Sequence, residues 1–307
     1  MRYTWKKVDI GAIDTLGRQF EKVVRGCNQG SISTRHTYLA TMLRFIKFIA
    51  LEFNVQKIQN IQDKHLYVYG NKLKKEGKEE TYIKKELSAI RFFHNQTNGT
   101  RFELMDSNSF NQKILELNAK KEKPDRSWTE IEIVNFLKIA EKLKRHELVL
   151  VVYAALILGL RIDEAVSLKT IRVVKALEEN KLYLANTKGG RPRTLYLSCE
   201  QRKLLEIIKE NAEGEYAICP LIYMENHEIH KFKKSIQNFI YKHQKEIADP
   251  NKETMPTFHG LRHTFAQNLD RKLIAKGYTL KKSAIKVGNA LGHGDNRPDI
   301  TYAYLHR

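Results

Sequence analysis

A short segment near the C-terminus, "TFHGLRHTF", combines the residue types that bind phosphate. Thr257 can cap a helix whose first turn holds His259 and Arg262, and residues three apart share a helix face. The free amides and the dipole at a helix N-terminus favour anions, and a guanidinium matches the oxygens of a phosphate. The segment therefore predicts a phosphate-binding site.

The same segment could instead bind a metal ion, because His259 and His263 lie four residues apart. A metalloprotease helix would carry a glutamate directly after the first histidine, and here glycine stands there. No third ligand is evident from the sequence. We therefore expect His263 to be a packed helix histidine, and we expect neither a metal site nor a cofactor.

Two further cationic positions are ambiguous by themselves. Arg161 follows about thirteen apolar residues in "LVLVVYAALILGLRIDEAVSL", so it either caps a helix end or is held against a buried site. Lys188 lies at the tip of a predicted hairpin, with Arg191 and Arg193 beside it. Such a tip either inserts cations into a nucleic-acid groove or is a solvated turn.

The C-terminal segment "GNALGHGDNRPDITYAYLHR" places His293 at a Gly-His corner before a short helix with Tyr302 and Tyr304. A tyrosine hydroxyl is a nucleophile only if its pKa of about 10 is offset, which costs roughly 4 kcal/mol at neutral pH. Two arginines and a histidine around one phosphate could supply that energy through charge-assisted hydrogen bonds.

The net charge indicates a polyanionic partner. Among 307 residues, 54 Lys and Arg face 35 Asp and Glu, a formal charge of +19 spread over both halves of the chain. Nucleic acid or an anionic membrane surface would suit this charge. The longest apolar run is too short to span a bilayer and the start lacks an apolar signal region. Three scattered cysteines indicate no disulfide framework and favour a reducing, cytoplasmic location.

The first half of the chain is predicted to be all-helical. Apolar residues recur at helical spacing over residues 33–53 and 81–96, and basic residues lie off those stripes. A polar, proline-containing stretch follows at residues 118–127. We predict a helical domain at 1–120, a linker at 121–127 and a second domain at 128–307. The basic residues off the apolar stripes, which are the candidate contacts to a polyanion such as DNA, are Arg35, Arg44, Lys47, Lys84, Lys85 and Arg91.

The second half mixes helices with one hairpin. A helix should begin behind Ser127 or Thr129, an apolar helix should cover residues 148–160, and two β-prone runs flank a Lys-Gly-Gly-Arg turn. Ser198 and Gln201 fit a capping box. Further helices are expected at 230–247, 258–274, 279–291 and 298–306. The fold class is therefore mainly α with a small antiparallel β element.

The ordered set "GLRIDE", "TKGG", "HGLRH", "LGH" and "YLH" resembles the catalytic half of the tyrosine recombinase, or phage integrase, family. The resemblance covers residues 125–307 in motif detail. The first half is similar to the helical core-binding (SAM-like) domain of that family only in its pattern. The resemblance implies an α+β catalytic domain that cleaves and rejoins DNA strands.

The resemblance also assigns roles. Arg161 and Arg262 would hold the non-bridging oxygens of the scissile phosphate, with Glu164 as a supporting acid. His259 would act as general base, and Tyr304 would attack to give a 3′-phosphotyrosyl enzyme. In addition, the resemblance makes Lys188 the general acid that protonates the leaving 5′ oxygen, and His293 a hydrogen-bond donor to the phosphate.

The implied reaction is site-specific recombination or integration of a mobile element, without metal or ATP. The implied partner is double-stranded DNA, bound by a homotetramer on two recombination sites and associated with the nucleoid. The usual spacing of the family would place the nucleophile at Tyr302; we favour Tyr304 because it precedes Leu-His. A type IB topoisomerase, which religates the strand it cut, and a non-catalytic DNA-binding relative are the alternatives.

Overall fold

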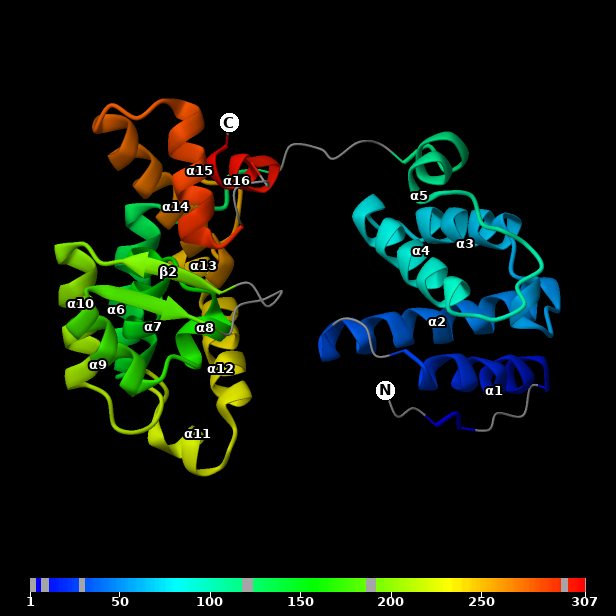
Figure 1. Cartoon of the computed structure of the whole chain (residues 1–307), viewed down its shortest axis with the longest axis horizontal. Coiled ribbons are helices and arrows are strands. Elements are labelled where there is room, and N and C mark those ends of the chain that lie inside the picture. Colours follow the sequence, from blue (N-terminus) through cyan, green and yellow to red (C-terminus); the bar gives the residue numbers. More distant parts are fainter. Residues whose placement is uncertain are drawn as a thin grey trace. The chain divides into compact units, whose positions relative to one another are not determined.

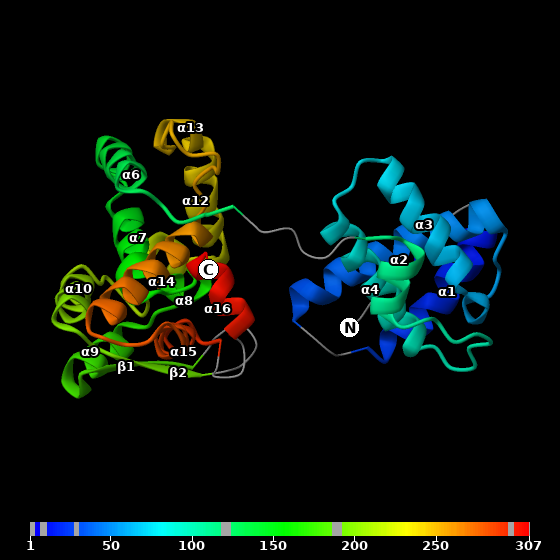
Figure 2. The ribbon, with the colours of Figure 1, turned by 90° about the horizontal axis from the view of Figure 1, so that it is seen from above.

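The computed structural model describes residues 4–6, 11–27, 31–117, 124–185, 192–293 and 298–306. The chain forms two compact units, residues 1–121 and 122–307 (Figures 1 and 2). The predicted boundaries stay a prediction. Residues 124–127 of the predicted linker fall within the second unit, where Asp125 accepts a hydrogen bond from Gln267 and the Ser127 carbonyl accepts one from Lys252.

All the regular secondary structure in the described residues of the first unit is helical. Ser31 caps its longest helix by accepting from the amide of Thr34, and Asn54 ends that helix in the left-handed conformation. A core of large apolar side chains, including Phe20 and Phe45, fills the space between the helices. The elements are α1 (Gly11–Arg25), α2 (Ile32–Phe53), η1 (Ile58–Asn60), α3 (Asp63–Lys75), α4 (Glu80–Asn95), α5 (Ser107–Ser109) and the π-helical turn η2 (Phe110–Ile114).

A buried carboxylate connects three of these helices. Glu86 of α4 is 1% exposed and accepts hydrogen bonds from Thr41 and Arg44 of α2 and from Tyr69 of α3. Burial opposes ionisation of Glu86, but these hydrogen bonds outweigh it and lower its pKa. The ionised group therefore holds α2, α3 and α4 in one arrangement.

Arg91 differs from the sequence-based expectation of an outward-facing cation. Its side chain is 8% exposed and lies 4.7 Å over the ring of Phe110, and its Nε donates to the carbonyl of Met105. The periodicity of α4 indicated a solvent-facing position, but the segment around α5 and η2 folds back over it. We therefore exclude Arg91 from the DNA-contacting set.

The second unit combines helices with one small sheet, which confirms the predicted fold class. The strands pair antiparallel with Lys181 opposite Tyr196 and Leu184 opposite Arg193. The hairpin tip, with Lys188 and Arg191, lies outside the described residues. The elements are α6 (Glu130–Lys142), α7 (His146–Leu158), α8 (Ile162–Val166), α9 (Thr170–Glu179), β1 (Lys181–Leu184), β2 (Arg193–Tyr196), α10 (Cys199–Glu210), α11 (Leu221–Glu225), α12 (Ile229–Lys242), α13 (Gln244–Ile247), α14 (Phe258–Ala275), α15 (Leu280–Leu291) and α16 (Pro298–Leu305).

Helix α7 forms the centre of this unit. It is apolar around much of its circumference and packs against α6, α10 and α14 (Figure 2). Gly159 ends it at φ 64°, and a Cβ there would lie 2.6 Å from the ring of Phe265 in α14. Only glycine combines that backbone angle with so close a neighbour. The turn at Gly159 leads directly to Arg161.

Helix ends in the second unit follow the capping residues that the sequence indicated. Thr129 and Glu132 form a capping box at α6, and Ser198 and Gln201 form one at α10. Thr257 accepts from the amide of Gly260 at the start of α14. These caps fix where the helices begin, and hence which residues occupy their first turns.

No helix in the described part of the chain is long and apolar enough to cross a membrane. Cys27, Cys199 and Cys219 are free thiols, two of them buried.

The start of α14 is packed tightly against the segment before α6, which makes Gly260 a sensitive position. A Cβ at Gly260 would lie 2.3 Å from the carbonyl oxygen of Arg126 and 2.8 Å from the ring of Trp128. We predict that Gly260→Ala lowers the free energy of unfolding by about 1–3 kcal/mol through overpacking, measured by chemical denaturation. Gly11→Ala, where a Cβ would meet nothing within 4 Å, is the control and should not destabilise. Equal stability of Gly260→Ala and the unsubstituted protein would contradict the close contact.

Candidate active site

Glu164 organises the buried part of the site. It is 4% exposed in the first turn of α8 and accepts two hydrogen bonds of 2.7 Å from the guanidinium of Arg193. Arg161 adds a 2.7 Å bond from Nη1 and a 2.8 Å bond from its backbone amide. Burial opposes ionisation of Glu164, but the bonds and charge of Arg193 and the bonds of Arg161 outweigh it and lower its pKa to about 2.

Arg161 and Arg262 converge on one carbonyl group. Both donate from Nη2 to the carbonyl oxygen of Leu291, at 3.2 and 2.8 Å. Arg262 also donates to the carbonyl of Gly159 and is 1% exposed. Burial and the nearby charge of Arg161 lower the pKa of Arg262 to about 10, so it stays protonated at neutral pH. Leu291 is the last residue of α15, two residues before His293.

The arginine cluster carries more positive than negative charge. Three guanidinium groups, of Arg161, Arg193 and Arg262, surround Glu164, with Arg262 Nη1 4.0 Å from its Oε2. Because buried charge is unfavourable unless it is balanced, a cluster of this kind favours an additional anion. A phosphate diester has the charge and the oxygen geometry that arginine forks bind.

Arg193 occupies a different place from the exposed position that the sequence suggested. Its side chain is 5% exposed, is paired with Glu164, and lies against Gly292, where a Cβ would be 3.0 Å from Arg193 Cδ. The β1–β2 register turns Arg193 inward, next to the core-facing Leu195. It therefore supports the site from inside and leaves the set of candidate DNA-contacting residues.

Tyr304 lies within a group of histidines at the other side of the site. Its hydroxyl is 3.1 Å from Nε2 of His259, at the exposed first turn of α14. The Tyr304 ring stacks on His263 at a centroid distance of 4.3 Å and lies 5.1 Å from the ring of His293. His293 is buried, and its Nδ1 is 3.3 Å from the hydroxyl of Thr301. The pairing of α14 with α16 creates this group (Figure 1).

His263 contacts the Tyr304 ring, and Tyr302 is the other candidate nucleophile. Burial and the nearby charge of His259 lower the pKa of His263 to about 3, so His263 is a neutral stacking partner, as expected for a packed helix histidine. Tyr302 and Tyr304 both pack against a small apolar cluster that includes Phe265 and Val287. Of the two candidate tyrosines, Tyr304 is the one within hydrogen-bonding distance of a candidate base.

The basic residues of the first unit differ in their exposure. Lys47 and Lys85 are exposed, whereas Arg35 and Lys84 are half-buried. Arg44 is half-exposed and ion-paired with the buried Glu86 at 2.6 Å. Lys47 and Lys85 therefore remain the most accessible of the predicted contacts.

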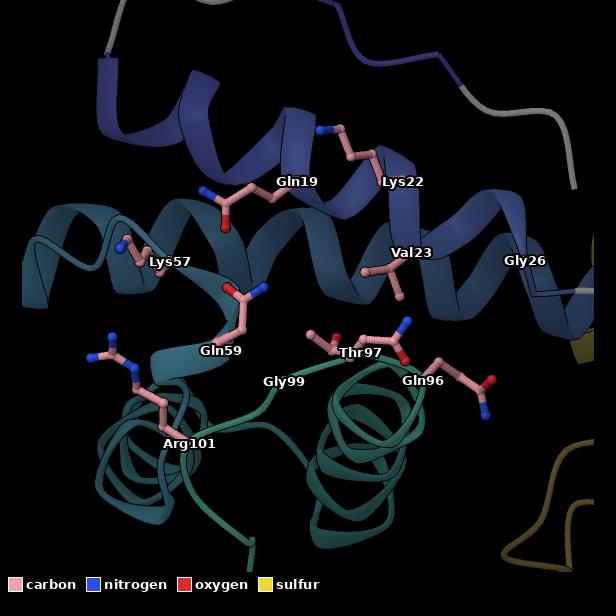
Figure 3. A pocket seen from close by; sticks show the side chains of 11 residues that line it. Gln19, Lys22, Val23, Gly26, Lys57, Gln59, Gln96, Thr97, Gly99 and Arg101 are labelled. Atoms are coloured by element: carbon pink, nitrogen blue, oxygen red, sulfur yellow. The ribbon is translucent and has the colours of Figure 1, made fainter.

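A polar pocket in the first unit was not indicated by the sequence. Figure 3 shows it between α1 and the loops that follow α2 and α4. Lys22, Lys57 and Arg101 line it together with the amide side chains of Gln19 and Gln59. Because these residues come from three separate segments, no local pattern in the sequence joins them. Cations and amides of this kind suit contacts with phosphates and bases.

Sequence comparison identifies the family directly. The model of the phage integrase family matches residues 126–306, which is more than half of the chain. The chain belongs to the phage integrase family. The family's N-terminal SAM-like domain matches residues 18–96. As a member of this tyrosine recombinase family, the chain is a DNA recombinase. A comparison with curated proteins gave no match.

Solved structures share the fold of this recombinase. A lambda integrase dimer bound to a COC′ core site aligns with a TM-score of 0.63 at 17% identity, covering 94% of this chain and 77% of that one. A lambda integrase tetramer bound to a Holliday junction gives 0.64 at 18%, covering 92% and 75%. The Tn1549 transposon integrase in complex with transposon right end DNA gives 0.61 at 15%, covering 94% and 93%.

The charge of Glu164 should stabilise the recombinase. Its pKa of about 2 lies below the usual 4.5, so its contribution is complete above pH 4.5 and is lost as the pH falls towards 2. We predict that Glu164→Gln lowers the free energy of unfolding by about 3 kcal/mol at pH 7, and that this difference shrinks below pH 4.5. Denaturant unfolding at several pH values measures both effects.

The control for this substitution is Glu215→Gln, because Glu215 forms an exposed ion pair with Lys169. Its effect should stay within about 0.5 kcal/mol. A Glu164→Gln variant that matches this control at pH 7 would show that the buried pairing contributes little.

Proposed function

We propose that this protein is a site-specific recombinase that cleaves DNA through a 3′-phosphotyrosyl intermediate formed on Tyr304. One observation carries the proposal: the Tyr304 hydroxyl lies 3.1 Å from a histidine nitrogen, in the unit whose buried guanidinium groups exceed the nearby carboxylate charge. A nucleophile, a base and a phosphate-binding cluster are the parts that acyl or phosphoryl transfer by an activated hydroxyl requires.

The proposed first step transfers the DNA phosphate to Tyr304. His259 accepts the proton of the Tyr304 hydroxyl, whose oxygen forms a bond to phosphorus. The bond from phosphorus to the 5′ oxygen breaks, and Lys188 donates a proton to that oxygen. The balance is one ester bond formed and one broken. The energy of the original bond is therefore retained, and a 5′-hydroxyl can reverse the step without ATP.

The arginines would stabilise the charge that develops on the phosphate. Arg161 and Arg262 would donate to its non-bridging oxygens, and His293 would add a hydrogen bond. Glu164 would act as a positioning residue, because it fixes the guanidinium plane of Arg161. Because these donors are already oriented by the fold, little reorganisation is needed when the transition state forms.

The proposed ligand is double-stranded DNA carrying a recombination site, and the proposed assembly is a homotetramer on two such sites. The net charge of +19 supports DNA as the ligand. The homotetramer is supported by analogy, through the similarity to lambda integrase, which was solved as a dimer on a core site and as a tetramer on a Holliday junction. The similarity to the Tn1549 integrase supports action on a mobile element. A strand-exchange assay on paired sites, set against plasmid relaxation, separates recombination from topoisomerase activity.

We predict that Tyr304→Phe abolishes the covalent protein–DNA adduct, whereas Tyr302→Phe retains most of it. Tyr304 lies beside His293, and its hydroxyl is 3.1 Å from Nε2 of His259, so its loss removes the group next to the candidate base. The assay uses a suicide substrate nicked beside the cleavage site, in EDTA. Mass spectrometry of the digested adduct then maps the modified peptide. An adduct on Tyr302, or one that forms only with divalent metal, would refute the assignment.

We predict that Arg161→Ala and Arg262→Lys reduce cleavage about 100-fold or more and leave DNA affinity within a few-fold. Donors to a developing charge act mainly on the rate. Lysine is chosen at position 262 because alanine would leave a cavity and would remove the guanidinium that donates to the Gly159 carbonyl. Single-turnover cleavage and equilibrium binding separate the two effects. Arg271→Ala, an exposed position on the same helix, is the control. A parallel loss of binding and folding would instead assign Arg161 a structural role.

A further inference from the structure

We propose that Asp125, His263 and His306 form a binding site for a divalent transition-metal ion such as Zn²⁺, which connects helix α16 to helix α14. The three side chains offer one carboxylate oxygen and two imidazole nitrogens, and these atoms lie within 4.8 Å of one another. A metal ion placed among them could reach all three with small side-chain adjustments. This site is separate from the proposed phosphate-binding cluster around Glu164.

The ligands come from three different segments of the second unit. Asp125 precedes α6, His263 lies in the second turn of α14, and His306 directly follows α16. Asp125 is held in place by hydrogen bonds from the amide and hydroxyl of Ser127 and from the amide group of Gln267. Gln267 donates to both carboxylate oxygens, at 3.1 and 3.2 Å, and one of these two longer bonds would be given up to a metal ion. The sequence of α14 offers only His259 and His263 at ligand spacing, because the fold brings Asp125 and His306 to His263 from distant segments.

His263 gives a second, independent indication of a ligand. Its side chain is 8% exposed, and its Nδ1 has no hydrogen-bond partner among the residues that the structure describes. Buried polar atoms are rarely left unpaired in folded proteins, and each exception calls for an explanation. Metal coordination through Nδ1 would supply one, because a neutral ring nitrogen is a standard ligand for Zn²⁺.

The ligand chemistry favours a borderline metal over calcium or magnesium. Two imidazoles and one carboxylate suit Zn²⁺, Co²⁺, Ni²⁺ or Cu²⁺, whereas Mg²⁺ and Ca²⁺ prefer oxygen ligands throughout. Three protein ligands leave a fourth tetrahedral position for solvent. A bound ion would hold the end of α16 on α14, and with it the ring of Tyr304, which stacks on His263. The site would thus restrain the helix that carries the proposed nucleophile.

The competing explanation is an ion pair without metal. His306 Nε2 lies 3.4 Å from Asp125 Oδ1, and a protonated His306 could satisfy that carboxylate. Such a pair requires no metal ion, whereas the proposed site binds one through all three side chains. The two explanations therefore differ in what is bound.

The test uses the full chain, freed of any affinity tag, stripped of metal with EDTA and kept without DNA. Zn²⁺ is titrated in competition with a chromophoric chelator, and Co²⁺ is added separately to record its visible absorption. We expect one tightly bound equivalent, the intense absorption of four-coordinate Co²⁺, and slower hydrogen exchange of the α16 amides when Zn²⁺ is present. Absence of the tight equivalent or of the Co²⁺ absorption would overturn the proposal.

The diagnostic variant is His306→Asn. His306 has φ 52°, and asparagine tolerates this left-handed conformation better than alanine, so the backbone should be retained while the imidazole is lost. Zn²⁺ affinity should fall at least tenfold in His306→Asn and in Asp125→Asn. The control, His230→Ala, removes an exposed histidine of α12 and should bind Zn²⁺ unchanged. If His306→Asn binds as tightly as the control, the cluster is the ion pair alone.

These measurements do not rest on the proposed recombination chemistry. Adduct formation on Tyr304 is assayed in EDTA with DNA, and metal binding is assayed without DNA. Either proposal can therefore fail while the other stands.

Discussion

The arrangement of the second unit depends on supplying partners to buried arginine side chains. The side chains of Arg193 and Arg262 are almost fully buried and that of Arg161 is 20% exposed, and Glu164 is the carboxylate that pairs with them among the described residues. One negative charge is too little to balance them, so the remaining stabilisation comes from backbone carbonyls, notably those of Gly159 and Leu291. The ends of α7 and α15 must therefore lie where they do, and the glycines that end or follow these helices make this possible.

This constraint links the two sides of the site. Leu291 accepts from two arginines, and His293, two residues further on, lies beside the ring of Tyr304. The end of α15 and the turn that follows it therefore connect the arginine cluster to the histidines near Tyr304. A displacement of α15 would move the acceptor of Arg161 and Arg262 and the histidine next to Tyr304 at the same time.

Local sequence signals predicted the framework better than they predicted the orientation of charged side chains. Thr129, Ser198 and Thr257 marked their helix starts because capping depends on residues three apart. Arg91 and Arg193 were expected in solvent, and both are buried because segments distant in sequence cover or pair with them. The grouping of Asp125 with His306 likewise needs the whole fold of the unit. The motif "HGLRH" indicated the site because its histidines and arginine lie within about one helical turn. The carbonyls that accept from Arg262 come from distant segments, so the sequence did not indicate them.

The Leu291 carbonyl has a consequence for how the site would respond to its surroundings. It accepts from both guanidinium groups and so keeps them directed at one point. The desolvation of Arg262 is therefore completed when the chain folds and not when it meets DNA. Mobile ions screen exposed lysines such as Lys47 and Lys85 far more than a group sealed from solvent. Ionic strength should accordingly govern how often the protein engages DNA, while the speed of the bond-breaking event, once engaged, should be almost indifferent to it.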